Sequence, residues 1–410
     1  MLSARVINFL LRGITLGCKF LLVFFLAKLL EPTDLGLYGL LVATTTYCLY
    51  VIGFEFYTYS MRELIASSKN SHAGILLNKL AFYAAAYVIF MPLLMVIFWT
   101  ETLPWSLLVW FYVLLVLEHA NQELNRILVA LSLQIKASIV LFVRSGFWVL
   151  FIIPLMWSMP WLREIKFVLA AWCISGMLSV ALAIKWIFRE ISFTNLLPIN
   201  FNWIKKGFLV SLPMLVAAIG LQGLFVFDRH IVEWIAGLET LGAYVLFAGI
   251  GAAMISFLDA GVLVFFYPQV VKAARSKNLN DFREMIKKIT INVVLSMLIL
   301  SVVAYGVSVV VVSWLEKSIY AENFYLIKWI IVAMFIFGMN HIPHLGLYAQ
   351  GRDRPIVLSH LTALISFIII AVFLNSYLGI VAVPLAMCSA FTLMAVWKVL
   401  AYKKMMRELL

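Results

Sequence analysis

The stretch ITINVVLSMLILSVVAYGVSVVVVSW, residues 289–314, contains no charged side chain. A helix needs about 20 consecutive apolar residues to cross the hydrocarbon core of a bilayer. The stretch is too long and too evenly apolar for a barrel strand, and an open strand would leave its backbone N–H and C=O groups unpaired in lipid. It therefore predicts a membrane-spanning α-helix.

The whole chain shares this composition. Of its 410 residues, 65% are hydrophobic and 12% are charged, whereas soluble proteins have about 25% charged residues. This composition excludes a soluble globular enzyme, a disordered protein and a disulfide-stapled secreted domain. We predict an all-α polytopic membrane protein with twelve helices, at residues 8–30, 36–58, 76–99, 104–127, 138–157, 166–188, 207–232, 241–268, 288–314, 325–348, 356–374 and 379–401.

The net charge of +12 indicates orientation rather than nucleic-acid binding, because cytoplasmic loops of membrane proteins are rich in lysine and arginine. With the N-terminus in the cytoplasm, most of the 31 basic residues fall at cytoplasmic ends and loops, including Lys79 and Lys398. Both termini are therefore predicted to be cytoplasmic. The four cysteines form no CxxC pair, so neither a metal site nor a disulfide framework is expected.

Two matching turns indicate an internal repeat. LGLYGL at 35–40 follows the first predicted helix, and LGAYVL at 241–246 follows the seventh. The shared pattern L-G-x-Y-x-L recurs after half the chain. Since six helices precede the second copy, both halves have the same orientation, which implies a parallel repeat about an axis normal to the membrane. We expect an N-lobe at 1–200 and a C-lobe at 201–410.

Basic residues within the predicted spans are the first candidate site residues. A charge at the bilayer centre costs at least about 2.5–3.5 kcal/mol and usually faces a protein interior or a watery cavity. Lys19, in the middle of the first helix, either lines such a cavity or pairs with a carboxylate. Arg12 lies on nearly the same face of that helix. It either anchors the helix at the membrane interface or forms, with Lys19, the inner end of a line of positive charges. Arg144 either reaches the headgroups or is a second cavity cation.

Acidic residues within the spans are the second set. Glu55 and Asp259 lie at matching depth in the two halves, and each could carry a proton or cation or form a local ion pair. Asp228 and Arg229 close the helix at 207–232. They form either an interfacial ion pair or an outer gate with a cation site for an anionic ligand.

Polar side chains in two other predicted helices have structural alternatives. Glu118, Gln122 and Arg126 share one face at i,i+4 spacing, which favours a polar seam between helices, although Glu118 could also take part in ion coupling. His341 and His344 flank Pro343. Their spacing could serve a metal, but no carboxylate or cysteine lies nearby in the sequence, so we expect a kink supported by polar groups.

Several motifs are missing from the sequence. There is no G-x-x-x-x-G-K-[ST] for an ATP-driven motor, no H-E-x-x-H and no G-x-S-x-G. The predicted outer loops are too short to hold the chemistry of a glycan polymerase or ligase. We therefore predict a protein that is not an enzyme and that needs no cofactor and no metal.

The segment AKLLEPTDLGLYGL, residues 27–40, resembles the start of bacterial polysaccharide exporters of the MOP (multidrug/oligosaccharidyl-lipid/polysaccharide) superfamily. The matching positions are Lys28, Leu30, Pro32, Asp34, Gly36 and Tyr38, with Leu35 where an aromatic residue is common. The second half is similar, with Asp228-Arg229, then L-G-x-Y at 241–244, then Tyr267-Pro268. The resemblance covers essentially the whole chain.

The members most like this chain are O-antigen flippases of the Wzx type, which act in lipopolysaccharide biosynthesis. The resemblance implies a multi-pass protein of the bacterial inner membrane, with two six-helix lobes around a central cavity. It implies that the cargo is an undecaprenyl-diphosphate-linked glycan moved to the outer leaflet by alternating access, with membrane lipids and possible polysaccharide polymerase and chain-length machinery as partners, and no nucleic acid.

In that reading, cations would hold the diphosphate in the low-dielectric cavity. The candidate cations are Lys19, Arg144, Arg229 and Arg12, and an ion gradient would act through Glu55, Asp228, Asp259 or Glu118.

Two other functions remain open at this point. A multidrug or cation antiporter of the same superfamily would need an acidic cavity, against which the intramembrane Lys19 and Arg144 argue. A membrane glycan polymerase would need larger outer loops.

Overall fold

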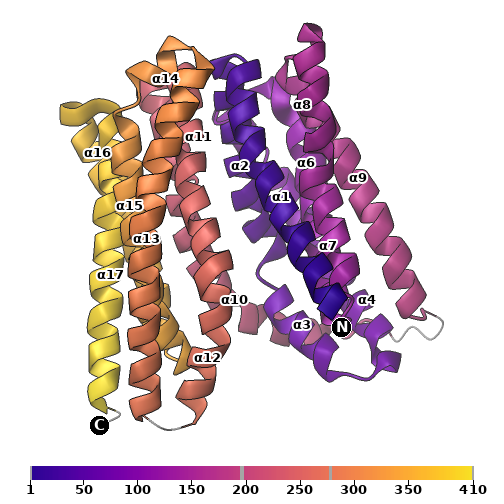
Figure 1. Cartoon of the computed structure of the whole chain (residues 1–410). Helices are drawn as coiled ribbons and strands as arrows, with labels where there is room; N and C mark the ends of the chain where they lie inside the picture. The colour runs from indigo at the N-terminus through magenta and orange to yellow at the C-terminus, as the bar shows by residue number, and fades with distance from the viewer. Residues whose placement is uncertain (1, 194–197, 277–278, 409–410) are drawn as a thin grey trace. The chain divides into compact units, whose positions relative to one another are not determined.

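The computed structural model describes residues 2–193, 198–276 and 279–408, with side chains from residue 6 onward. All regular secondary structure within these ranges is helical (Figure 1). Residues 194–197 of the linker between the halves, and residues 277–278 of the break before the ninth predicted span, lie outside them.

The N-terminal half contains the counterparts of the first six predicted helices. Its helices are α1 (Leu2–Leu29), α2 (Pro32–Gly53), α3 (Tyr57–Ala66), α4 (His72–Leu93), α5 (Val96–Trp99), α6 (Leu108–Ala130), α7 (Gln134–Phe142), α8 (Trp148–Ser158) and α9 (Ile165–Glu190). A π-helical turn, Val143–Phe147, joins α7 to α8. Within this half α1 packs against α7 and α8, and α6 packs against α9 (Figure 1).

The C-terminal half contains the counterparts of the other six. Its helices are α10 (Phe201–Leu224), α11 (Phe227–Leu258), α12 (Val264–Arg275), α13 (Leu279–Leu315), α14 (Ser318–Glu322), α15 (Leu326–Ala349), α16 (Asp353–Leu378) and α17 (Ala382–Glu408). A π-helical turn, Asp259–Leu263, joins α11 to α12. Here α15 packs against both α13 and α17 (Figure 1).

Within the described ranges, nine helical runs are long and apolar enough to cross a membrane. Four of them contain more than one helix: Lys69–Trp99, Gln134–Ser158, Phe201–Arg275 and Asp353–Glu408. Helix α6 is not among the nine. It carries the polar segment from Glu118 to Arg126. The predicted all-α polytopic class is therefore confirmed.

The chain divides into two compact units. Unit 1 comprises Met1–Glu31 and Leu40–Ile219, and unit 2 comprises Pro32–Gly39 and Gly220–Leu410. The division runs through α2 and α10 rather than through the linker, so each of these helices contributes residues to both units. The simpler division at residue 200 stays a prediction.

The two L-G-x-Y segments, predicted as turns between helices, lie inside α2 and α11 instead and pack against each other within unit 2. A Cβ atom at Gly36 would lie 2.2 Å from the carbonyl oxygen of Leu238, and one at Gly242 would lie 2.1 Å from that of Pro32. The two contacts are reciprocal, since each glycine meets the residue four positions before the other glycine. Only glycine allows backbones to approach so closely. The repeat signal in the sequence thus marks a crossing of α2 with α11.

A second matched pair lies in the cores of the two halves. The amide of Asn121 on α6 donates to the carbonyl of Gly176 on α9 at 3.0 Å. The amide of Asn340 on α15 donates to the carbonyl of Phe391 on α17, also at 3.0 Å. Both asparagines are buried, at 0% and 2% exposed. Each half therefore ties its fourth long helix to its last long helix by the same bond.

Two predicted helix boundaries were wrong. The prediction has Glu55 inside the helix at 36–58, but α2 ends at Gly53 because Phe54 and Glu55 both have left-handed backbones, with φ of 51° and 53°. The prediction has Asp228 at the end of the helix at 207–232, but α10 ends at Leu224 and Asp228 lies in the first turn of α11. The chain leaves helical geometry at Gly237, where φ is 76°.

Candidate functional site

Two predicted site residues of unit 1, Glu118 on α6 and Arg144 on the π turn, form an ion pair, and a third, Lys19 on α1, lies beside them. Arg144 donates from Nε to Glu118 Oε2 at 2.9 Å, and its Nη2 contacts the same oxygen. Trp172 on α9 donates from Nε1 to Glu118 Oε1 at 2.9 Å. Glu118 is 7% exposed. The charge of Arg144 is therefore paired with Glu118. We call Glu118, Arg144 and Trp172 the Glu118 group.

Lys19 lies beside the Glu118 group and interacts electrostatically with Arg144 and Glu118. Its side chain is exposed, in the middle of a helix whose other residues are mostly apolar. Unlike Arg144, Lys19 forms no ion pair with any residue that the structure describes. Lys19 and the Glu118 group together carry a formal charge of +1, and the accessible part of that charge is the Lys19 ammonium.

Arg12 lies two helical turns before Lys19 and is also exposed. Its Nε donates to the hydroxyl of Ser138 on α7 at 3.4 Å, and that hydroxyl contacts the amide oxygen of Asn8. Arg12 is therefore anchored by neutral groups and keeps its charge accessible. The structure places Lys19 and Arg12 along one helix as two accessible cations.

A second charged cluster in unit 1, which the sequence did not predict, is buried between α4 and α6. Glu123 accepts an ion pair from Lys79 at 2.6 Å and a second from Arg126. Lys79 is 3% exposed and Glu123 is 6% exposed. Next to them, His119 Nδ1 lies 2.7 Å from the hydroxyl of Tyr87. We call Lys79, Glu123 and Arg126 the Glu123 network.

The sequence analysis predicts Arg126 in a polar seam between helices and Lys79 as a charge at the cytoplasmic end of a helix. One signal could have identified Lys79, namely its position inside the apolar run ILLNKLAF at 75–82. A lysine in such a run needs a buried acid, since an unpaired buried charge is very costly.

Glu55 lies in the break between α2 and α3, outside the membrane-length helices. Burial raises the pKa of its carboxyl, and this effect outweighs the opposing influence of Arg126 and of a hydrogen bond with Tyr57. The guanidinium of Arg126 also lies 3.4 Å from the centre of the Tyr57 ring. Glu55 is thus connected to the edge of the Glu123 network through Arg126.

The raised pKa of Glu55 predicts a pH-dependent stability. A carboxyl whose pKa is higher in the folded state than in the unfolded state favours folding when protonated, so its contribution falls as the pH rises through the interval between the two pKa values. We expect Glu55→Gln to melt at a higher temperature than the wild type at pH 8, with the difference shrinking towards pH 4. Melting curves of both proteins across that range test this, and a difference independent of pH would contradict it.

In unit 2, Asp228 and Arg229 form an ion pair with 3.6 Å between Oδ1 and Nη1. Asp228 is 2% exposed and accepts a hydrogen bond from Tyr244 at 2.9 Å. Arg229 also contacts the carbonyl of Phe225. Asp228 thus connects the first turn of α11 to Tyr244, the tyrosine of the L-G-x-Y segment in the same helix.

Asp259 differs from Asp228. It is exposed at the first position of the π turn between α11 and α12, and it forms no ion pair within the described part of the chain. The residue at the equivalent depth of the first half, Glu55, lies in a helix break. Both acids therefore sit where regular α-helix is interrupted.

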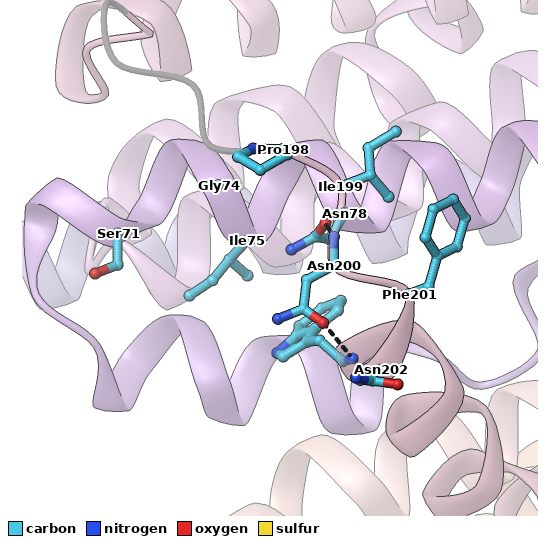
Figure 2. Close-up of a pocket in the computed structure, with 10 residues that line it drawn as sticks. Ser71, Gly74, Ile75, Asn78, Pro198, Ile199, Asn200, Phe201 and Asn202 are labelled. Atoms are coloured by element: carbon cyan, nitrogen blue, oxygen red, sulfur yellow. Dashed lines mark hydrogen bonds between the residues drawn. The ribbon is translucent and has the colours of Figure 1, made fainter.

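A pocket of about 580 Å³ lies in unit 1, where the start of α4 meets the start of α10 (Figure 2). The backbone N–H of Asn200 donates to Asn78 Oδ1 at 2.7 Å, and that of Trp203 donates to Asn200 Oδ1 at 3.0 Å. These bonds use the amide oxygens to hold the junction together. None of the predicted site residues lines this pocket.

Neither a protein-family model nor a curated protein sequence matches the chain. Solved structures do match. An inward-facing multidrug resistance MATE family transporter of the MOP superfamily has a TM-score of 0.77, with 13% identity over 98% of both chains. An outward-facing transporter of the same description has a TM-score of 0.60, with 14% identity over 100% of this chain and 93% of that one.

A third solved structure is a MOP superfamily transporter from Pyrococcus furiosus, with a TM-score of 0.63 and 13% identity over 99% of this chain and 94% of that one. It is described as having a binding pocket of reverse polarity, which suggests a different function.

The chain is thus a polytopic helical membrane protein with the fold of the MOP superfamily transporters. Within that fold it resembles MATE structures over nearly its full length.

Proposed function

We propose that this protein is a flippase that moves an undecaprenyl-diphosphate-linked oligosaccharide from the cytoplasmic to the periplasmic leaflet by alternating access. It would act in the bacterial inner membrane with both termini in the cytoplasm, within the synthesis of O-antigen or a related surface polysaccharide. A polysaccharide polymerase and chain-length machinery would take over its product.

The observation that carries the proposal is the state of Lys19. An accessible ammonium in the middle of an apolar helix is costly if it faces lipid, so Lys19 belongs at a watery, polar surface. Arg144 is already paired with Glu118, which leaves the charge of Lys19 available for a ligand. An anionic diphosphate is the part of the proposed cargo that such a cation binds best.

The other candidate residues differ in whether their charges are already paired within the protein. Arg12 extends the accessible positive charge along α1, whereas Arg229 is occupied by Asp228. Among the proposed coupling acids, Glu118 and Asp228 are ion-paired, Glu55 lies near Arg126, and Asp259 has an exposed carboxylate. Asp259 is therefore the best placed of the four to exchange a proton or a cation with water.

Transport of a fluorescent polyprenyl-diphosphate glycan between the leaflets of proteoliposomes tests the proposal. A hydrogen bond to a charged group contributes about 1.5–3 kcal/mol, so Lys19→Ala should slow translocation by roughly tenfold or more. Lys19→Arg should retain most of it. Lys136→Ala, which removes a partly exposed lysine paired with Glu190, is the matched control and should leave transport unchanged. Transport by Lys19→Ala at the wild-type rate would remove Lys19 from the mechanism.

A second function, export of cationic drugs by antiport, is supported by the names of two of the matching structures, which are multidrug resistance transporters. For this function Lys19 would be unfavourable, and Lys19→Glu should increase efflux of a cationic dye. In the flippase, Lys19→Glu should abolish glycan translocation and give no dye efflux.

A further inference from the structure

Unit 2 contains a buried group of basic side chains that the proposed cargo site does not use. Lys398 on α17 is 2% exposed and His360 on α16 is 5% exposed. Lys398 Nζ lies 3.2 Å from His360 Nε2 and 3.1 Å from Met394 Sδ. His344 on α15 lies next to them, with its ring parallel to that of His360 at 6.1 Å between centroids. We call Lys398, His360 and His344 the basic cluster.

The side chains that contact the Lys398 ammonium are a histidine and a methionine. Lys398 forms no ion pair within the described ranges. Helix α15 presents His341 and His344 to it, and α16 presents His360. The ionisable side chains of α11 are Asp228, Arg229, His230, Glu233, Glu239 and Tyr244. Of these, Tyr244 contacts α17 at Met387, about 16 Å along the helix from Lys398 at 1.5 Å per residue. The other charged groups of α16 and α17 are exposed near helix ends: Arg354, Asp353, Lys403, Lys404, Arg407 and Glu408.

The spacing of the two nitrogens limits the charge that the pair can hold. When Lys398 is an ammonium it donates to a neutral His360, and when the proton moves, the Nζ–H bond breaks and an Nε2–H bond forms. Two positive charges at hydrogen-bond distance in a low-dielectric interior repel strongly. The pair therefore holds a single proton on two nitrogens. The burial of both side chains excludes a larger anion as the ligand.

A row of aromatic titratable side chains connects the basic cluster to the exposed surface. The His344 ring is parallel to the Tyr348 ring, with 6.5 Å between centroids. Tyr348 in turn meets Tyr267 on α12, with 5.6 Å between centroids and a hydrogen bond between the two side chains. Tyr348 is 42% exposed and Tyr267 is 40% exposed. A proton thus has polar side chains at intervals between the surface and Lys398.

We propose that Lys398 and His360 form a proton-binding site of unit 2, reached by way of His344, Tyr348 and Tyr267. Binding of the proton requires only the geometry of these side chains. Its use to couple a proton gradient to glycan movement rests on the proposed function. Such a site would act in addition to the carboxylates considered above.

The test is solid-state NMR of the full-length protein in lipid bilayers, with ¹⁵N-labelled lysine and histidine, between pH 5 and pH 9. We expect the Nζ signal of Lys398 and the ring signals of His360 to change together with one midpoint. Lys398→Met should remove that common transition, while Lys403→Met, an exposed lysine of the same helix, should leave it in place. Separate midpoints, or no change of either signal, would overturn the proposal.

If Lys398→Met does not fold, His360→Gln carries the test, because it removes the proton acceptor and should abolish the common transition seen at Lys398. Proteoliposomes then test coupling: Lys398→Met should lose the acceleration of glycan translocation by an imposed pH gradient, and an unchanged response would overturn the coupling role. A common NMR transition in a wild-type protein that moves no glycan would defeat the proposed cargo and leave the proton site established.

Discussion

Glu123→Gln is expected to destabilise the protein by about 3–5 kcal/mol, the cost of removing one partner from a buried ion pair. The substitution keeps the shape of the side chain and removes its charge. It leaves Lys79, which is 3% exposed, with its ammonium facing a neutral amide. Arg126 loses the same partner and retains its contact with the Tyr57 ring and the more distant Glu55.

The buried cysteines provide the measurement. Cys18, Cys48 and Cys173 are buried in the folded protein, so a thiol-reactive fluorescent dye reports their exposure as the protein melts. Glu284→Gln removes an exposed acid that pairs with Lys288 one helical turn away and should leave the melting temperature unchanged. Equal melting of the Glu123 and Glu284 variants would contradict the structural role of the network.

A double variant distinguishes the loss of the attraction between Lys79 and Glu123 from the cost of leaving Lys79 buried without its acid. Lys79→Met combined with Glu123→Gln removes both members of the closest pair, and buried pairs replaced by neutral groups of similar size often lose little stability. We expect the double variant to be more stable than Glu123→Gln alone, since residues in contact are not additive. A double variant less stable than the single one would show that Lys79 stabilises the fold independently of Glu123.

Gly242→Leu is expected to cause the second large loss of stability. Its Cβ would lie 2.1 Å from the carbonyl oxygen of Pro32, and that backbone cannot rotate away as a flexible side chain could. Overpacking commonly costs about 1–3 kcal/mol, and separation of α2 from α11 would add the loss of their contacts. Because the crossing is reciprocal, Gly36→Leu should have a similar effect.

Gly306→Ala is the matched control, because Gly306 lies within α13 and a Cβ atom there has no neighbour within 4 Å. Alanine favours helix over glycine by about 1 kcal/mol, so this variant should melt at or above the wild-type temperature. The same dye assay applies. Tolerance of leucine at both Gly36 and Gly242 would contradict the close crossing.

The positions of the long helices could be predicted from the sequence because apolar length alone determines them. The L-G-x-Y repeat also indicated a twofold arrangement, which the reciprocal contacts of Gly36 and Gly242 display. The predicted helix boundaries are wrong where the apolar sequence continues through a break between two helices. The run from 207 to 232 looks like one helix, yet the chain breaks after Leu224.

The pairing of charges was harder to predict, since it depends on which helices are neighbours. Lys19 and Arg144 look equivalent in the sequence, but only Arg144, on the π turn, forms an ion pair with Glu118 of α6. Lys79 and Lys398 each lie near one end of an apolar run, which made them resemble loop charges. Packing buries both, one against an acid and the other against histidines.

Asn121 and Asn340 restrict the motions that each half can make. Either helix could rotate about its own axis only by breaking an interhelical amide bond in a place that water does not reach, where an unpaired polar group is costly. Each half should therefore move as a rigid body, and the helices that carry these asparagines should not rotate about their own axes. The flexibility needed for any cycle of opening and closing falls to segments without such a tie, such as the left-handed turn at Phe54 and Glu55 and the kink at Gly237.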